Sequence, residues 1–184
     1  TTATAPQNTP PKIITIGSSV VGMTALIYRL LRNEWTENSQ LTIGASFVRY
    51  SITDTGGDPV DVEIWDTGSS TALSVQRIYV KRLADAVMLG YAVDDAESFQ
   101  AVENWVNYLN SPEFQLASTK RPFILIVGCK SDLEQQAVPQ ARLQRLIQQH
   151  GCHHIVTSAR NGHNVQEAFA IAARGALGQK ADDG

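Results

Sequence analysis

Polar residues and glycines follow the apolar runs of this 184-residue sequence, with types and spacing suited to phosphate chemistry. The stretch GSSVVGMT has the spacing of a phosphate-binding loop, in which backbone N–H groups and a helix N-terminus converge on phosphate oxygens. Methionine stands where the pattern G-x-x-x-x-G-K-[ST] has lysine, so taken alone the stretch is more simply an ordinary strand-to-helix turn. Its candidate phosphate-binding residues are Gly17, Ser18, Ser19, Val20, Val21, Gly22, Met23 and Thr24.

Thr24 and the three further loops fit magnesium and base recognition. Thr24 offers a hydroxyl for Mg²⁺, and Asp66 follows an apolar run where a carboxylate can hold water bound to Mg²⁺. In GCKSD, Asp132 can accept both hydrogens of a guanine N1/N2 edge while the stem of Lys130 packs on the base. TSAR, residues 157–160, can place its backbone beside the base oxygen. Each position is also common in turns, and only their order along the chain favours a nucleotide site.

The elements that must position these loops alternate between apolar runs and amphipathic segments. Two runs of period two flank DTGGD, whose Gly56 and Gly57 can take the positive φ of a hairpin turn. The alternation predicts an α/β fold with a mostly parallel six-stranded sheet, one antiparallel hairpin and about five helices. The expected strands are 13–17, 47–53, 59–65, 85–93, 122–128 and 153–159, and the expected helices are 24–35, 74–83, 98–110, 139–150 and 165–177.

Composition limits the class of protein. A hydrophobic content of 43% over this length supports one core, with residues 1–11 expected as a disordered leader and 179–184 as a tail. The net charge of -3 excludes a general electrostatic grip on nucleic acid. No apolar run is long enough to span a bilayer, and the two cysteines lack the spacing of a disulfide scaffold, so a cytoplasmic location is expected.

Six stretches in order resemble the Ras superfamily of small GTPases, and its Ras and Rab branches in particular, over residues 12–177: GSSVVGMT, TIGASF, WDTGSST, YAVDDAESF, GCKSD and TSAR. The resemblance implies a three-layer P-loop G-domain over residues 12–178 that binds GTP or GDP with Mg²⁺ and contacts effector proteins. The implied Mg²⁺ ligands are Thr24, Thr42 and Asp66, and the implied switch or effector residues are Thr42, Ile43, Gly44, Phe47, Asp66, Ser69 and Arg77. The implied guanine-binding residues are Trp35, Cys129, Lys130, Asp132, Ser158, Ala159 and Arg160.

Trp35 has two interpretations. It stands eleven positions after Thr24, where the family places an aromatic residue over the guanine. It can equally be an aromatic residue of the core or of a helix end, the commoner use of tryptophan. The sequence favours stacking on the base.

The chain departs from the family at five positions. Met23 replaces the phosphate-contacting lysine and has no hydrogen to donate. Ser69 replaces the glycine that senses the terminal phosphate, and Ser70 replaces the glutamine that positions water, which leaves no confident catalytic residue. Cys129 replaces the asparagine of the guanine loop with a weak thiol donor. Val20 also stands where the family has a small residue, which can strain the loop or narrow its mouth.

These departures predict a regulatory G-domain with weakened guanine-nucleotide binding and little or no GTP hydrolysis, acting through an effector or scaffold protein. One alternative is a nucleotide-free pseudoGTPase scaffold, and a third is an active GTPase with a non-standard catalytic residue. Attachment to a membrane is expected only through a lipidated tail that this sequence does not contain.

Overall fold

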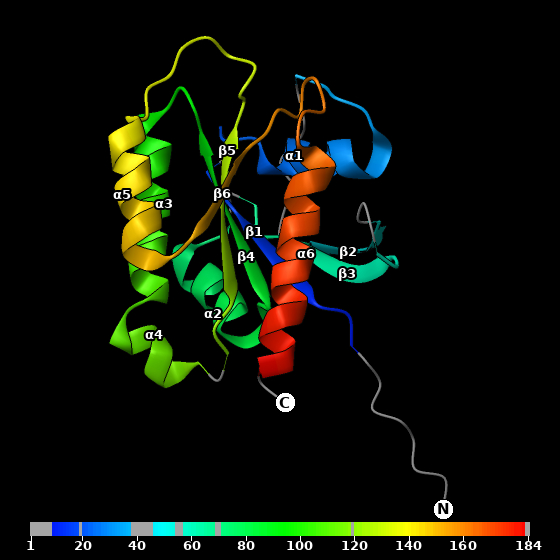
Figure 1. Cartoon of the computed structure of the whole chain (residues 1–184), viewed down its shortest axis with the longest axis vertical. Helices are drawn as coiled ribbons and strands as arrows, with labels where there is room; N and C mark the ends of the chain where they lie inside the picture. Colours follow the sequence, from blue (N-terminus) through cyan, green and yellow to red (C-terminus); the bar gives the residue numbers. More distant parts are fainter. Residues whose placement is uncertain are drawn as a thin grey trace, which may run out of the picture.

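The computed structural model describes residues 9–18, 20–37, 46–53, 57–68, 71–118 and 120–182. A six-stranded sheet in the order β2-β3-β1-β4-β5-β6 lies between two layers of helices (Figure 1). The strands are β1 (Lys12–Ile16), β2 (Ser46–Ile52), β3 (Val60–Asp66), β4 (Ala86–Ala92), β5 (Phe123–Cys129) and β6 (His153–Val156). The helices are α1 (Met23–Arg32), α2 (Leu73–Leu83), α3 (Ala96–Leu109), α4 (Pro112–Ala117), α5 (Gln140–His150) and α6 (Val165–Asp182).

The strand pairing confirms the predicted topology. β1 lies parallel to both β3 and β4, and β5 lies parallel to β4 and β6. Only β2 and β3 pair antiparallel, from Ser46 opposite Asp66 to Ile52 opposite Val60. The turn between them differs in detail, because Gly57 does not take a positive φ. The remaining turn residues 54–56, which include Gly56, lie outside the described residues.

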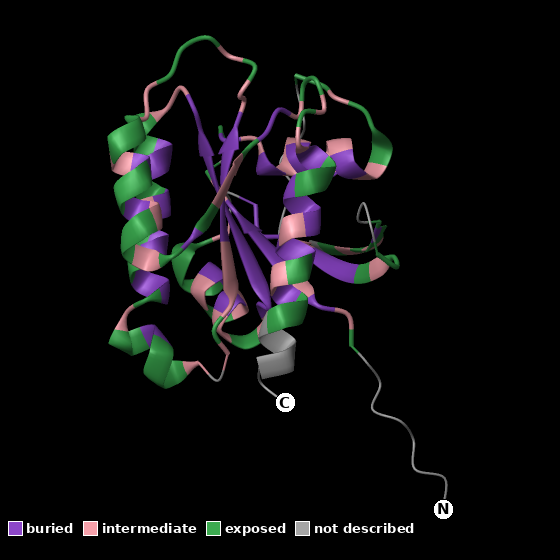
Figure 2. Cartoon of the chain, viewed as in Figure 1, coloured by how far each residue is buried: buried purple, intermediate pink, exposed green. Residues whose placement is uncertain are grey.

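Each face of the sheet is covered by its own apolar cluster. One cluster joins α1 and α6 to the sheet, and the other joins α2, α3 and α5 to the opposite face. All seven residues of β4 are buried, which explains their continuous apolar run (Figure 2). On α3, five apolar residues at helical spacing are all buried: Phe99, Val102, Trp105, Val106 and Leu109.

Most element ends lie within two residues of the sequence prediction, but the strand predicted at 153–159 ends at Val156, and three helices differ from the prediction as follows. The first helix ends at Arg32, because Asn33 takes a left-handed conformation with φ of 54°, so Trp35 lies beyond the helix. The short helix α4 was not predicted; Pro112 begins it and Ser111 caps it, accepting a hydrogen bond from the Phe114 backbone N–H. The last helix continues to Asp182, past the boundary expected at residue 178. Within the described residues, no helix combines the length and apolarity needed to cross a membrane.

Candidate functional site

The predicted site residues lie at one edge of the sheet, where strands β1, β3, β5 and β6 end. These strands run parallel, so their carboxyl ends meet at the same edge, beside α1 (Figure 1). The loop after β1, the Asp66 end of β3, and the loops after β5 and β6 therefore adjoin one another. This edge is where α/β sheets hold their ligands.

The loop after β1 is a tight turn that leads directly into α1. The Val21 N–H donates to the Ser18 carbonyl at 3.0 Å, and the Leu26 N–H donates to the Gly22 carbonyl at 3.0 Å. Gly22 caps the helix at a φ of 93°, which disfavours any residue with a side chain. Because glycine has no side chain to cap the helix, N–H groups of the first turn are available to an anion. The side chain of Val20 is 57% exposed, so it does not narrow the loop by packing inward.

Met23 points into the core rather than toward solvent. Its side chain is only 5% exposed and belongs to the apolar cluster beneath α1. The Cys129 thiol donates a weak hydrogen bond to Met23 Sδ at a sulfur–sulfur distance of 3.7 Å. Burial raises the pKa of the Cys129 thiol to about 12, so this group is neutral at physiological pH. Two of the predicted departures from the family, one in each loop, are thus in direct contact.

The candidate Mg²⁺ ligands Thr24 and Asp66 lie side by side. Thr24 Oγ1 donates to Asp66 Oδ2 at 2.9 Å, and Thr15 Oγ1 donates to Asp66 Oδ1 at 3.4 Å. A hydroxyl and a carboxylate are hard oxygen ligands that fit Mg²⁺. No group of three or more His, Cys, Asp or Glu side chains in the described part of the chain could hold a metal ion by itself. Mg²⁺ at this position would therefore need further oxygens from water or from phosphate.

Most of the predicted guanine-binding residues line one cavity of about 220 Å³. Asp132 is fixed at its edge, because Ser158 Oγ donates to Asp132 Oδ1 at 2.7 Å. Each carboxylate oxygen has two lone pairs, so Asp132 can still accept two hydrogens from a base. Ser158 itself is fully buried and supports the cavity from behind. The predicted residues that line the cavity are Trp35, Cys129, Lys130, Asp132, Ala159 and Arg160.

Arg29 connects the two sides of this cavity, a role that the sequence did not predict. The Arg160 guanidinium lies 5.3 Å from the centre of the Trp35 ring. Arg29 donates one hydrogen bond to the Arg160 carbonyl at 3.2 Å and another to the Asn33 carbonyl at 2.9 Å. It therefore holds the loop after β6 against the chain segment that carries Trp35. No motif contains Arg29, so its role follows only from its contacts in the folded chain.

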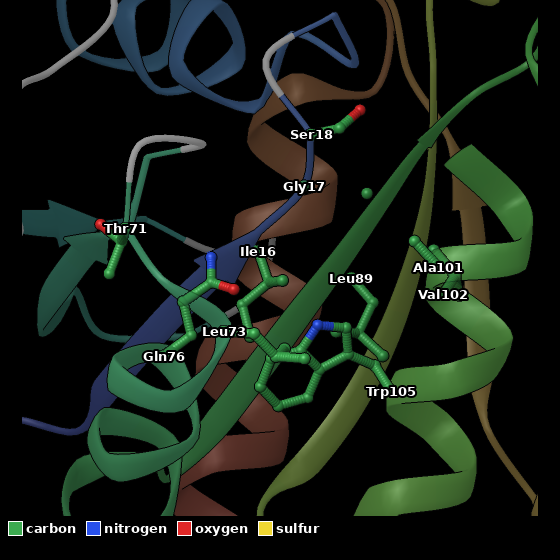
Figure 3. Close-up of a pocket in the computed structure, with 11 residues that line it drawn as sticks. Ile16, Gly17, Ser18, Thr71, Leu73, Gln76, Leu89, Ala101, Val102 and Trp105 are labelled. Atoms are coloured by element: carbon green, nitrogen blue, oxygen red, sulfur yellow. The ribbon is translucent and has the colours of Figure 1, made fainter. Parts of the chain in front are cut away.

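A second cavity, of about 350 Å³, opens below the loop after β1, between α2 and α3. Figure 3 shows Gly17 and Ser18 of the loop at one end and Gln76 and Trp105 further down. Gln76 is 7% exposed and donates to the Thr67 carbonyl at 3.1 Å. Thr67 Oγ1 in turn donates to the Thr15 carbonyl at 2.9 Å. This buried polar chain ties α2 to the ends of β1 and β3.

An apolar surface begins at the same edge and runs over β2, β3 and α2. Phe47 is 49% exposed and stacks on Trp65 with ring centres 4.8 Å apart, and Trp65 contacts Tyr79 at 6.0 Å. On α2, Val75 is 39% exposed and Ile78 is 50% exposed. We refer to these five residues as the α2–β3 surface. Of the predicted effector residues, only Phe47 belongs to this surface. The exposed apolar residues within 73–83 are the sequence signal for its part on α2.

Some predicted site residues lie elsewhere or outside the described residues. Arg77, expected in the effector surface, packs its guanidinium over the Tyr108 ring of α3 at 4.1 Å. The residues outside the described part of the chain are Ser19, Thr42, Ile43, Gly44, Ser69 and Ser70.

Comparisons with known proteins agree with this architecture. The family model described as the Ras family matches residues 12–177. The chain is 31% identical over 167 residues to the Ras-related protein Rab-13 of Bos taurus, a match that covers 90% of this chain and 79% of that protein. It is 32% identical over 181 residues to the Ypt/Rab-type GTPase YPT7 of Saccharomyces cerevisiae, covering 94% and 84%. It is 35% identical over 159 residues to the Ras-related protein Rab-4 of Dictyostelium discoideum, covering 86% and 75%.

Proposed function

Since this chain belongs to the Ras family of small GTPases and is Rab-like, we propose that it is a regulatory protein that binds guanine nucleotide weakly, hydrolyses GTP very slowly or not at all, and acts by contacting a partner protein. Members of this family generally bind GTP or GDP with Mg²⁺. We propose that this chain keeps nucleotide binding only in a weakened form.

The cavity around Asp132 is the observation that carries the proposal. Its carboxylate is held by Ser158, its volume is about 220 Å³, and Trp35 and Lys130 line it. An aromatic ring and an alkyl stem suit the faces of a purine, and a carboxylate suits the N1/N2 edge of guanine. The base end of the site therefore supports retained selectivity for guanine.

The phosphate end supports weakened affinity. Met23 is buried and supplies no positive charge where the family has lysine. Losing a hydrogen bond to a charged group costs about 1.5 to 3 kcal/mol, which is roughly ten- to a hundred-fold in affinity. The loop still offers backbone N–H groups, and Thr24 and Asp66 still offer oxygen ligands for Mg²⁺. Phosphate binding is thus reduced to backbone and metal contacts.

GTP hydrolysis needs a residue that positions water, and this chain lacks the family's glutamine at that position. Ser70 stands at the position of the family's glutamine, and its side chain is too short to repeat that reach. Gln76, the glutamine nearest in sequence, has its amide engaged with Thr67. We therefore expect GTP turnover at or below the rate of an unassisted family member.

The α2–β3 surface is the proposed partner-binding region. It combines the exposed apolar side chains of Phe47, Val75 and Ile78. Apolar side chains gathered on a surface are typical of protein interaction sites. A partner that binds wild-type protein should be lost on Ile78→Asp and kept on Leu116→Asp, because Leu116 is 89% exposed but lies on α4.

A nucleotide-free scaffold is the second candidate function. The contact between Met23 and Cys129 favours it, because both residues have become part of the apolar core rather than part of a ligand site. In that case the α2–β3 surface would act without any nucleotide. We propose a cytoplasmic location, with membrane contact only through a lipidated segment outside this sequence.

Two measurements test the proposal. Purified protein is denatured and any released nucleotide is identified by chromatography, and the affinity of a fluorescent GDP analogue is measured with Mg²⁺ and with chelator. We expect Mg²⁺-dependent binding that guanosine nucleotides displace and adenosine nucleotides do not. Absence of both released nucleotide and analogue binding would reject it in favour of the scaffold.

A further inference from the structure

Met23 lies in a space that two glycines leave open beneath the phosphate-binding loop. A Cβ placed on Gly90 would lie 2.6 Å from Met23 Cγ and closer still to Met23 Sδ. A Cβ placed on Gly17 would lie 2.9 Å from the same Cγ atom. Real Cβ atoms essentially never approach another heavy atom this closely, so Met23 can occupy its place only while both positions lack a side chain.

Backbone conformation does not account for a glycine at position 90. Gly90 lies inside β4 opposite Val127 of β5, and its φ is not positive. A glycine in the interior of a strand weakens that strand and often marks a close approach by another group. The group that approaches Gly90 most closely is the thioether of Met23.

We propose that Gly90 is a positioning residue for the phosphate-binding loop, because it provides the space in which Met23 ties the loop to the core. Met23 is the first residue of α1 and follows Gly22 directly, so fixing its side chain fixes the junction of loop and helix. Methionine suits this role, since its flexible thioether fills irregular spaces. Its sulfur meets the Cys129 thiol at 3.7 Å, which joins the loop to the end of β5 as well. The assignment of the loop to phosphate rests on the proposed function, whereas the contact between Gly90 and Met23 does not.

A double-mutant cycle tests the contact. Gly90→Ala should lower the thermal midpoint by about 5 °C, since overpacking a core is destabilising. Met23→Ala should lower it by about 10 °C, because it leaves a cavity. In the double variant, Gly90→Ala should cost little beyond Met23→Ala, since the atoms that the new Cβ would meet most closely are gone. Gly178→Ala is the matched control, because a Cβ there meets no atom within 4 Å, and it should leave the midpoint unchanged or slightly raised.

The position of the loop is followed by hydrogen exchange of the backbone N–H groups of residues 20–26. Gly90→Ala should speed their exchange about tenfold or more, while Gly178→Ala should not. Affinity for the fluorescent GDP analogue should fall about tenfold in Gly90→Ala for the same reason. If wild-type protein binds no analogue, the proposed function fails. The thermal midpoints and the exchange rates of the loop still test the contact between Gly90 and Met23.

Equal destabilisation by Gly90→Ala in wild-type protein and in the Met23→Ala variant would overturn the inference, and so would unchanged exchange at the loop. If Gly90→Ala alone does not fold, a folded double variant supports the inference. A double variant that also fails to fold overturns it, because removing the methionine side chain should then have relieved the clash.

Discussion

The two ends of the candidate nucleotide site differ in what holds their residues in place. At the base end, Asp132 is held by a hydrogen bond of 2.7 Å from Ser158, and its polar atoms remain at the edge of a cavity. At the phosphate end, Met23 is held by packing against Gly90 and by the thiol of Cys129. One end presents donors and acceptors that a ligand can use, and at the other the residue in the position of the family's lysine is part of the apolar core.

The packing at the phosphate end requires no bound ligand. A buried lysine would need a phosphate or another anion to offset the loss of water around its charge. Methionine needs no such partner, so the loop can keep its shape with or without nucleotide. The base end also carries a departure from the family, Cys129, but Asp132 beside it is exposed to solvent, so its carboxylate keeps contact with water when no ligand is present.

Among the substitutions that test this difference between the two ends, Asp132→Ala should cause the largest change in nucleotide affinity. Removing the carboxylate deletes the acceptors for two base hydrogens, so affinity for a guanine nucleotide should fall at least about a hundred-fold. Calorimetric titration with GDP and Mg²⁺ measures the change. Glu134→Gln, an exposed substitution in the same loop, is the control and should leave affinity unchanged. A loss of less than tenfold would show that the base end does not carry recognition.

Met23→Lys should move stability and affinity in opposite directions. The thermal midpoint of nucleotide-free protein should fall by about 5 °C, because an ammonium replaces a buried thioether. Affinity for GDP should rise about tenfold, because the lysine can reach the phosphates when a nucleotide is present. Met23→Leu, which conserves apolar volume, should change both only slightly. A variant that gains affinity without losing stability would contradict the packing role of Met23.

Ser158→Ala should have a smaller effect at the base end. It removes the hydrogen bond to Asp132 Oδ1 but leaves the carboxylate in place, so GDP affinity should fall roughly three- to tenfold. The same titration measures it, and Ser74→Ala, an exposed change on α2, serves as control. An effect as large as that of Asp132→Ala would mean that Asp132 acts only through Ser158.

The smallest expected effect is a dependence of stability on pH that His154 causes. Burial lowers the pKa of His154 from its ordinary value near 6.5, and its Nε2 lies 2.9 Å from the Tyr91 hydroxyl. The folded state therefore binds fewer protons than the unfolded state, so stability is fully present above about pH 6.5 and is lost as pH falls through the lowered pKa. Thermal unfolding should show the midpoint falling between about pH 7 and pH 5. The His154→Gln variant should show a flatter profile over this range, and an equally steep one would exclude His154 as the cause.

The sequence predicts the fold well because its signals are local. The continuous apolar run of β4, the alternation in β2 and β3, and the inward stripe of α3 each follow from side-chain period. The helix α4 escaped prediction because six residues are too few for a periodic pattern. The end of α1 was misplaced because the left-handed conformation of Asn33 is a cap that the apolar stripe does not reveal.

The candidate site likewise contains residues that local motifs predict and residues that they do not. The motifs predicted that Trp35, Asp132 and Ala159 would come together, and the structure brings them to one cavity. Arg29 and Gly90 were missed, because each acts on residues far away in the sequence: Arg29 on Arg160, and Gly90 on Met23. Contacts of this kind depend on how strands and helices pack, and no spacing rule encodes them.

The contact between Gly90 and Met23 also links the substitutions that the two positions tolerate. Any side chain at position 90 conflicts with the present position of Met23, so the glycine must persist for as long as the methionine stays there. A lysine at position 23 that extends toward a phosphate would leave this space open. What position 90 tolerates therefore depends on the residue at position 23, and the two positions cannot be substituted independently.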